Sequence, residues 1–429
     1  MVTPILLETH GSSRLLKIFF WTAVNLFSAA FILFLYLIKP FKFLKLFLLI
    51  DDKIGHLAAN TDLFLRRIQN GAIKIEKGAF YIAIASKNQP NLQLFKMFKR
   101  KLLEVFKGRL KVVQISEPNY IQTFLRAVFS SKSLFGRTIF YQPLFAETYY
   151  THEFSTIKPN LSFTPEEERH GKKLLRKIGM KEGSWFVCFH NRDSTFLKQT
   201  SDPQEWKYYN YRDSDINNYL KAAQYITSKG GFAVRMGSIV SKKLPSFKNP
   251  RIIDYASKFR ADFLDIYLLA KCKFLLVSTS GLTTIAAIFN RPIALANIIP
   301  VIYPPIRKDS IYIPKKIWSK KEKRFLKFSE MIGFEGGRYT YTKDFNEAGL
   351  VPVENTPKEI YELAKEMYAN LNGKYKYTKE DEKLQKKFRD IFQSSTTNRK
   401  DTCIGTNFLS KYNIRIGAKF LRENKDLLT

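Results

Sequence analysis

The sequence contains only three cysteines and five histidines among its 429 residues. Cys188, Cys272 and Cys403 are odd in number and far apart, so they suggest neither a disulfide framework nor a zinc cluster. This cysteine usage indicates a reducing compartment. Because the histidines are also widely spaced, we expect no dedicated metal site.

Several nucleotide-binding and hydrolase motifs are also missing. The chain has no Walker A sequence, no G-x-G-x-x-G, no G-x-S-x-G and no His-Glu-x-x-His. These absences argue against a P-loop ATPase, a dinucleotide oxidoreductase, a serine hydrolase and a zinc protease. We therefore expect no cofactor.

Acidic residues are scarce, since 38 Asp and Glu stand against 71 Lys and Arg, for a formal charge of +33. The partners of such a protein should be anionic. Lipid headgroups, nucleotide phosphates and nucleic acids all satisfy that requirement. No RNP-type, zinc-finger or basic-zipper pattern is present, so nucleic acid is not the expected partner.

Residues 19–38 form one uncharged apolar run, about the 20 residues that a helix needs to cross a hydrocarbon core. The run is long for a signal peptide, and no small-residue cleavage site follows it. A buried core helix is the alternative, and the sequence leaves open whether the helix spans the membrane or dips into one leaflet. An excess of basic residues on the C-terminal flank predicts that the body of the protein is cytoplasmic, at the inner face of the plasma membrane: Lys39, Lys42, Lys45 and Lys53 against Arg14 and Lys17.

Beyond this run, short apolar strands alternate with amphipathic helices, which predicts parallel sheets with right-handed crossovers. We predict an α/β protein with two Rossmann-like lobes (the GT-B architecture), an N-terminal membrane helix and closing C-terminal helices. The predicted segments are a membrane-anchoring helix (1–42), an N-terminal acceptor lobe (43–160), a C-terminal donor lobe (161–372) and a helical or polar extension (373–429).

The expected strands of the first lobe are 43–50, 80–85 and 110–115, and its helices are 55–68 and 92–103. In the second lobe, capping boxes at Thr164 and Thr356 open helices to about 179 and 371, and Thr378 opens one more. The other expected elements of that lobe are strands 185–189, 232–236, 252–255, 274–277 and 292–296, and helices from about 216, over 262–270 and over 282–289.

Ligands bind outside the carboxyl ends of parallel strands, so the residues that follow each strand are the candidates. The strand over 185–189 is followed by His190, Arg192 and Asp193. The forked guanidinium of Arg192 suits a diphosphate, and His190 can add a second donor or a cation. Alternatively, Arg192 pairs with Asp193 or another acid and has a structural role only.

Two further loops follow strands of the second lobe. Arg235 and Gly237 end one strand, and Arg235 either pairs with a buried acid such as Asp254 or reaches the same anion as Arg192. Ser278, Thr279, Ser280 and Gly281 precede a helix whose N-terminal N–H groups can bind an anion. Alternatively, these hydroxyls only cap the helix, and the two roles are compatible.

In the first lobe, the loop over 51–56 contains Asp51, Asp52 and His56. If the lobes face one another, His56 or one of the aspartates can deprotonate an acceptor hydroxyl, as an inverting sugar transfer requires. Alternatively, His56 is only a residue at a helix start.

Five blocks, taken in this order, resemble a group of bacterial glycosyltransferases of surface polysaccharide clusters. They are KIGHLAANTDLFLR (53–66), CFHNRDS (188–194), GGFAVRMGS (230–238), RIIDYA (251–256) and DFLDIYLLAKCKFLLVSTSGL (262–282). More distantly, His190-x-Arg192 is similar to the His-x-Arg segment with which GT-B fucosyltransferases hold a GDP-sugar, although their second adjacent arginine is absent. The resemblance implies a GT-B fold with the donor in the C-terminal lobe.

The sequence thus predicts a glycosyltransferase that moves a sugar from a nucleotide-sugar donor to a polysaccharide, lipid-linked or other surface glycan acceptor. His190, Arg192, Asp193, Arg235, Gly237 and residues 278–281 would hold the donor, and His56 or Asp52 would be the base. A cationic cleft could stabilise the leaving diphosphate without a metal ion. The alternatives are a non-catalytic polyanion-binding protein at the membrane surface, and a transferase of another activated group such as a polyol phosphate.

Overall fold

The computed structural model of the chain describes residues 14–116, 119–144, 151–193, 195, 210–246, 248–333, 339, 341–396 and 407–429. Ser194 and Cys403 lie outside the described residues. The chain divides into two compact units, which we describe separately. Unit 1 is Met1–Glu147 with Asn160–Ser162, and unit 2 is Thr148–Pro159 with Phe163–Thr429.

Unit 1 contains a three-stranded parallel sheet of order β1-β2-β3. Its strands are β1 (Leu44–Leu48), β2 (Phe80–Ser86) and β3 (Leu110–Ile115), joined through α3 (Ile54–Gln69) and α4 (Leu92–Phe106). Phe47, Phe64 and Phe106, one from β1 and one from each helix, contact one another and are at most 2% exposed. This aromatic core fixes the helices on the sheet.

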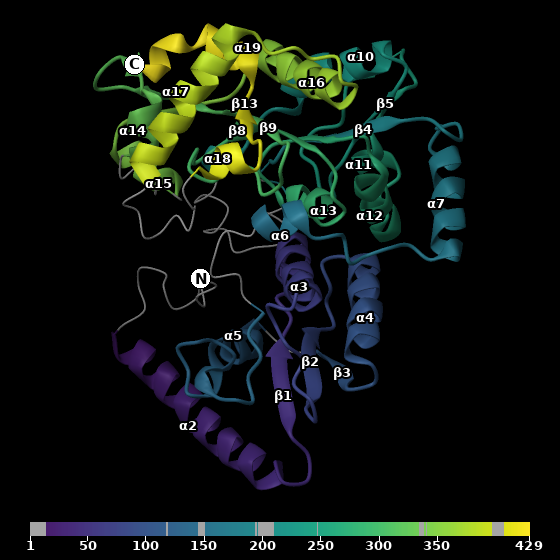
Figure 1. Cartoon of the computed structure of the whole chain (residues 1–429), viewed down its shortest axis with the longest axis vertical. Coiled ribbons are helices and arrows are strands. Elements are labelled where there is room, and N and C mark those ends of the chain that lie inside the picture. The colour runs from purple at the N-terminus through teal and green to yellow at the C-terminus, as the bar shows by residue number, and fades with distance from the viewer. Residues whose placement is uncertain are drawn as a thin grey trace. The chain divides into compact units, whose positions relative to one another are not determined.

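The long apolar helix α2 (Arg14–Ile38) belongs to unit 1. It lies beside α5 (Asn119–Val128), as Figure 1 shows. Its Phe31 also contacts Phe135 of the short helix η1 (Phe135–Arg137). One side of α2 is buried within unit 1, at Val24, Ser28 and Leu35.

Unit 2 contains a seven-stranded sheet of order β13-β9-β8-β7-β4-β5-β6, in which all pairs are parallel. Helices α10 (Leu220–Ser228) and α16 (Pro357–Leu371) lie on one side of it, and α12 (Asp262–Lys271) and α13 (Gly281–Ile288) lie on the other (Figure 1). The strands are β4 (Phe186–His190), β5 (Phe232–Arg235), β6 (Ile252–Ile253), β7 (Leu275–Val277), β8 (Ile293–Ile298), β9 (Ile311–Pro314) and β13 (Arg415–Ile416).

This strand order has a direct consequence for ligand binding. Counted within the unit, its first six strands run 3-2-1-4-5-6, which is the Rossmann order. The order reverses between β4 and β7, which are paired through Cys188, Phe189 and His190. Ligands of open parallel sheets bind outside the carboxyl ends of the strands at such a reversal, so the loops after β4 and β7 form the candidate site.

Helices complete unit 2. Capping boxes at Thr164 and Thr356 open α7 (Pro165–Lys177) and α16 (Pro357–Leu371), as predicted. A small antiparallel sheet of β11 (Arg324–Phe325), β10 (Lys316–Ser319) and β12 (Leu350–Val353) follows β9. The remaining elements are α6 (Thr151–Thr156), η2 (Asn210–Arg212), η3 (Ile216–Tyr219), α10 (Leu220–Ser228), α11 (Tyr255–Lys258), α12 (Asp262–Lys271), α13 (Gly281–Ile288), α14 (Phe328–Gly333), α15 (Thr342–Glu347), α17 (Lys379–Thr396), α18 (Phe408–Lys411), α19 (Ala418–Glu423) and η5 (Lys425–Leu428).

The predicted fold class is confirmed: the chain is an α/β protein with an N-terminal apolar helix, two Rossmann-like units with parallel sheets, and C-terminal helices. The expected strands and helices are present with small shifts at their ends. One difference is the helix expected from residue 216, which begins as the 3-10 turn η3 and becomes α-helical only at Leu220.

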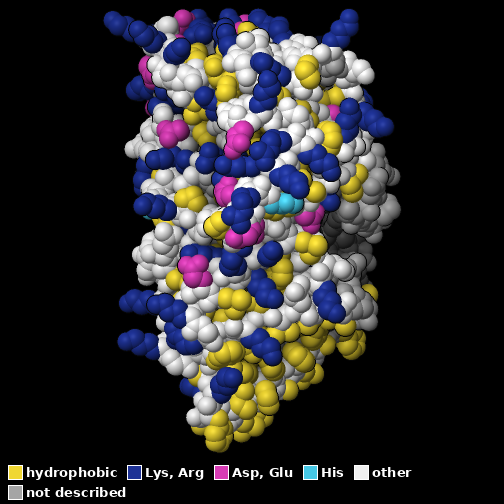
Figure 2. Space-filling model, turned by 90° about the vertical axis from the view of Figure 1, so that its right-hand side faces the viewer, with side chains coloured by type: hydrophobic (Ala, Val, Ile, Leu, Met, Phe, Trp, Pro, Cys, Tyr) yellow, Lys and Arg dark blue, Asp and Glu magenta, His cyan; other side chains and the backbone are white. Residues whose placement is uncertain are grey.

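The basic residues are distributed widely over the surface that Figure 2 shows, whereas hydrophobic side chains gather at its lower end. This is the height at which Figure 1 draws the C-terminal end of α2. Among the described residues, α2 is the one helix long and apolar enough to cross a membrane, by length and composition.

Candidate functional site

The two predicted anion loops of unit 2 meet at the reversal of the strand order. The backbone N–H of Arg192, after β4, donates to the Ser278 hydroxyl oxygen at 2.7 Å, and Ser278 directly follows β7. The Ser278 N–H donates to the His190 carbonyl oxygen at 3.2 Å. Because Ser278 is fully buried, it fixes the spacing of the two loops.

Thr279 and Ser280 stand at the start of α13. Ser280 is the N-cap residue, yet its side chain makes no capping hydrogen bond. The hydroxyls of Thr279, Ser280 and Thr283 are buried and have no hydrogen-bond partner within the described part of the chain. Capping alone therefore does not explain Ser280, whereas donors beside the positive end of a helix suit an anion.

His190 ends β4, and its Nδ1 lies 2.9 Å from the Met236 carbonyl oxygen, to which it donates. Burial is the main cause that lowers the pKa of His190 to about 4, and the charges of Arg235 and Arg192 act in the same direction. The imidazole is therefore neutral at pH 7. Its Nε2 is then a hydrogen-bond acceptor, which fits a sugar or ribose hydroxyl and disfavours the cationic role considered from the sequence.

The guanidinium of Arg192 is 3.9 Å from a carboxylate oxygen of Asp213, with the side chain 16% exposed. This separation exceeds the 2.7–2.9 Å that is typical of a charge-assisted hydrogen bond. Asp193 is held elsewhere, since its carboxylate accepts hydrogen bonds from the backbone and hydroxyl of Ser241, both at 3.1 Å. A structural role for Arg192 would thus include its pairing with Asp213.

Arg235 is 1% exposed and pairs with Asp254 at 3.4 Å, and it donates to the Lys242 carbonyl at 2.6 Å. Of the two roles left open by the sequence, these contacts support the internal ion pair. Burial lowers the pKa of Arg235, and the charge of Asp254 opposes that shift. Arg235 therefore links the end of β5 to Asp254 and to the Lys242 backbone.

Gly237 follows β5 and has a φ of +151°. Residues other than glycine rarely adopt this backbone conformation. A Cβ at this position would lie 2.8 Å from a methyl of Val240 and 3.7 Å from Nδ1 of His190. The glycine thus permits the close approach of this turn to His190.

Sequence reasoning missed the segment that holds Arg192 in place. Ser214 N donates to the Arg192 carbonyl at 3.0 Å, and Asn191 Nδ2 donates to the Ser214 carbonyl at 2.5 Å. Lys315, which follows β9, donates from Nζ to the carbonyls of Tyr211 and Asp213 at 3.0 and 2.6 Å. A buried lysine therefore fastens the segment 210–214 against the Arg192 loop.

Lys315 is only 3% exposed. Burial is the main cause that lowers its pKa to about 8; Arg192 lowers it further, whereas Glu354 and Asp213 raise it. Lys315 thus remains mostly protonated at pH 7 and adds positive charge beside Arg192. The sequence offered one signal for this residue, because Lys315 directly follows the apolar, strand-like run 311–314.

In unit 1, the predicted base residues form a pair. Nδ1 of His56 lies 2.9 Å from Oδ1 of Asp52, and Arg126 of α5 is 3.7 Å from Oδ2. Burial would raise the pKa of Asp52, but the hydrogen bond and charge of His56, together with Arg126, lower it to about 2. Asp52 is therefore ionised and a weak base, and it orients the imidazole of His56.

Asp51 has a different role. Its carboxylate accepts hydrogen bonds from Ser86 N and Gln89 Nε2, both at 2.7 Å. Asp51 is 5% exposed, and burial raises its pKa. It connects the ends of β1 and β2 and supports the loop that contains Asp52 and His56.

No family model matches the chain, and no curated protein matches its sequence. Solved structures that resemble it include E. coli ADP-heptose LPS heptosyltransferase II, with 11% identity, TM-score 0.43, and coverage of 77% of this chain and 100% of that one. A glycosyl transferase family 9 protein of Veillonella parvula has 9% identity, TM-score 0.35, and coverage of 59% and 80%. The iron-containing glycosyltransferase TibC of enterotoxigenic E. coli has 12% identity and a TM-score of 0.30. That match covers 62% of this chain and 64% of TibC.

All three proteins are named as glycosyltransferases. Their identities and TM-scores are too low to assign an activity to this chain.

The structure thus brings His190, Arg192, Gly237 and the loop 278–281 together around the ends of β4, β5 and β7. Asp52 and His56 meet in unit 1. Within the described residues, no group of three or more His, Cys, Asp or Glu side chains is arranged to hold a metal ion. Cys188 and Cys272 are free and buried.

Proposed function

We propose that the chain is a glycosyltransferase that takes a sugar from a nucleotide-sugar donor bound in unit 2. One observation supports the proposal most directly. Where the strand order of the Rossmann sheet reverses, the hydrogen bond from Arg192 N to Ser278 Oγ joins the loop that contains Arg192 to the hydroxyl-rich start of α13. This is the place where such sheets bind nucleotides.

The donor diphosphate would lie against the N-terminus of α13. There the hydroxyls of Thr279 and Ser280, which have no partner among the described residues, and the helix N–H groups can donate to phosphate oxygens. Arg192 and Lys315 add positive charge, so the leaving nucleoside diphosphate can be stabilised as the bond to the sugar breaks. In this proposal the charge stabilisation comes from protein groups and no metal ion is required.

On the acceptor side, His56 is the proposed base. Its Nδ1–H is directed to Asp52, so Nε2 is the basic atom. Nε2 would take the proton of an acceptor hydroxyl while the oxygen attacks the anomeric carbon and the nucleoside diphosphate leaves. Asp52 then stabilises the imidazolium that forms.

We further propose that the protein works at the cytoplasmic face of the plasma membrane, attached through α2, on a glycan or lipid-linked acceptor. Helix α5 supports this link because it contacts both regions of unit 1. Its Phe124 packs against Phe20 and Phe27 of α2, and its Arg126 reaches Asp52. The candidate base is therefore only one helix away from the membrane helix.

The test is a thermal-shift panel of nucleoside diphosphates and nucleotide sugars on the purified chain, followed by detection of released nucleoside diphosphate with membrane extracts as acceptor. Ligands that bind the native state raise the unfolding midpoint. A saturable response to one nucleotide class supports the proposal. Equal responses to all polyanions, abolished by salt, would instead indicate a non-catalytic polyanion-binding protein.

A further inference from the structure

Helix α2 has two apolar sides with different environments. The residues of its contact side recur every three or four positions along the helix. Among them, Val24, Ser28 and Leu35 are only 0–1% exposed. The opposite side is also apolar, yet it is exposed, with Phe19 at 72%, Leu26 at 68% and Leu33 at 63%. A water-soluble helix would place polar residues on that side.

The contact side of α2 packs against the rest of unit 1 along most of the helix. Phe27 contacts Phe124, Phe31 contacts Phe135 and Tyr36 contacts Phe140, with ring centroids 4.9–5.4 Å apart. The amide oxygen of Asn25 also accepts a hydrogen bond from Leu134 N at 3.1 Å. The helix is therefore a docked element of the α/β unit.

This docking is incompatible with a helix that spans the membrane. The elements beside α2 contain charged residues, among them Arg126 on α5, Arg137 on η1 and Lys45 on β1. If α2 crossed the bilayer in its docked position, these charges and the sheet edge would enter the hydrocarbon, where charges and unpaired backbone groups are costly.

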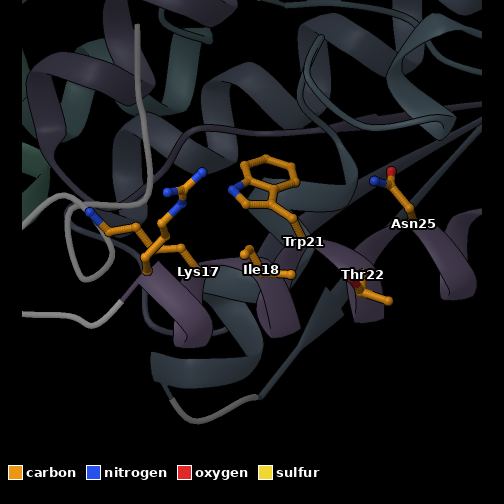
Figure 3. Close-up of a pocket in the computed structure, with 6 residues that line it drawn as sticks. Lys17, Ile18, Trp21, Thr22 and Asn25 are labelled. Carbon is orange, nitrogen blue, oxygen red and sulfur yellow. The ribbon is translucent and has the colours of Figure 1, made fainter.

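The two ends of α2 have the chemistry of a membrane interface. Arg14, Lys17 and Trp21 line an open hollow of about 360 Å³ at the N-terminal end, where Figure 3 shows the lysine, the indole and Asn25 along one helix. At the other end, Lys42 lies 4.3 Å from the ring centre of Phe80. Tryptophan and basic side chains prefer the headgroup level, and basic ones attract anionic lipids.

We propose that α2 lies in the plane of an anionic bilayer and inserts its exposed side into one leaflet, while unit 1 stays docked on its other side. The helix is about 37 Å long at 1.5 Å per residue, so it forms an extended contact. Both ends of the helix, and both termini of the chain, are then on the same side of the membrane. This proposal does not depend on sugar transfer.

The first test is topology, with one epitope tag at each terminus of the full chain in sealed membrane vesicles. Digestion of both tags by protease from the same side is expected. Protection of the N-terminal tag while the C-terminal tag is digested would show a spanning helix and overturn the proposal.

The second test is sedimentation of the full chain with vesicles of phosphatidylcholine alone or with phosphatidylglycerol. The double variant Leu26→Asp, Leu33→Asp should bind anionic vesicles at least tenfold more weakly, because both side chains belong to the inserted side. The control Leu103→Asp, on an exposed leucine of α4 in the same unit, should bind as the unchanged chain does.

Two outcomes of this second test would overturn the proposal. One is a chain that stays in solution as a dimer in the presence of anionic vesicles, because a second copy would then cover α2. The other is equal binding to both vesicle types, which would remove the role of the basic ends. The circular dichroism spectra of the variants identify any that fail to fold.

Discussion

Replacement of Arg192 by alanine tests the donor site most sharply. A phosphate charge about 4 Å from a guanidinium interacts by about 4 kcal/mol at an effective dielectric constant of about 20, which is an upper limit. Loss of one group that stabilises developing charge typically costs about 2–4 kcal/mol. We therefore expect kcat/KM to fall about 30- to 900-fold, since about 1.36 kcal/mol corresponds to tenfold.

The assay is release of nucleoside diphosphate, together with calorimetric titration of the nucleotide. The matched control is Arg169→Ala on α7 of the same unit, because Arg169 is 72% exposed in its ion pair with Glu166 and lies on a helix outside the site. The control should keep full activity and the same unfolding midpoint. Unchanged turnover in a folded Arg192→Ala protein would remove this residue from the mechanism.

Three further predictions concern the other site residues. Ser280→Ala should weaken nucleotide binding but change the free energy of unfolding by less than about 0.5 kcal/mol, because the Ser280 side chain makes no capping hydrogen bond. Thr164→Ala removes a capping hydrogen bond and should lower the free energy of unfolding, measured by chemical denaturation, by about 1 kcal/mol. His56→Ala should lower kcat about 10²- to 10⁴-fold with nucleotide affinity unchanged, and Asp52→Asn should lower kcat in the same sense; a large loss of nucleotide affinity would contradict this division of roles. Nucleotide affinity should fall as the pH rises through about 8, where Lys315 loses its proton. In the Lys315→Arg variant the affinity should stay constant over this pH range, and the same pH profile of affinity in both proteins would exclude a contribution of Lys315.

The sequence predicted those parts of the fold that have strong local signals. Apolar runs of strand length identified β2, β3 and β4, and capping boxes located the starts of α7 and α16 within one residue. The loops after β4 and β7 could be named in advance because parallel strands end at a common edge. Their direct contact through Ser278 follows from the strand order, which periodicity alone does not give.

The elements missed are those whose formation depends on distant contacts. Strand β13 has two residues and exists only because it pairs with β9. Helices α5 and η1 were not among the expected elements, and their aromatic residues pack against the distant helix α2. Likewise, the pKa of His190 and the burial of Lys315 depend on neighbours far along the chain, so their protonation could not be read from the sequence.

The most direct test of the donor site is a crystal structure of the chain with the nucleoside diphosphate that responds best in the panel. The account predicts phosphate oxygens within hydrogen-bond distance of Ser280 and the first N–H groups of α13, with Arg192 beside them. A nucleotide bound elsewhere on the molecule, with the start of α13 empty, would contradict it.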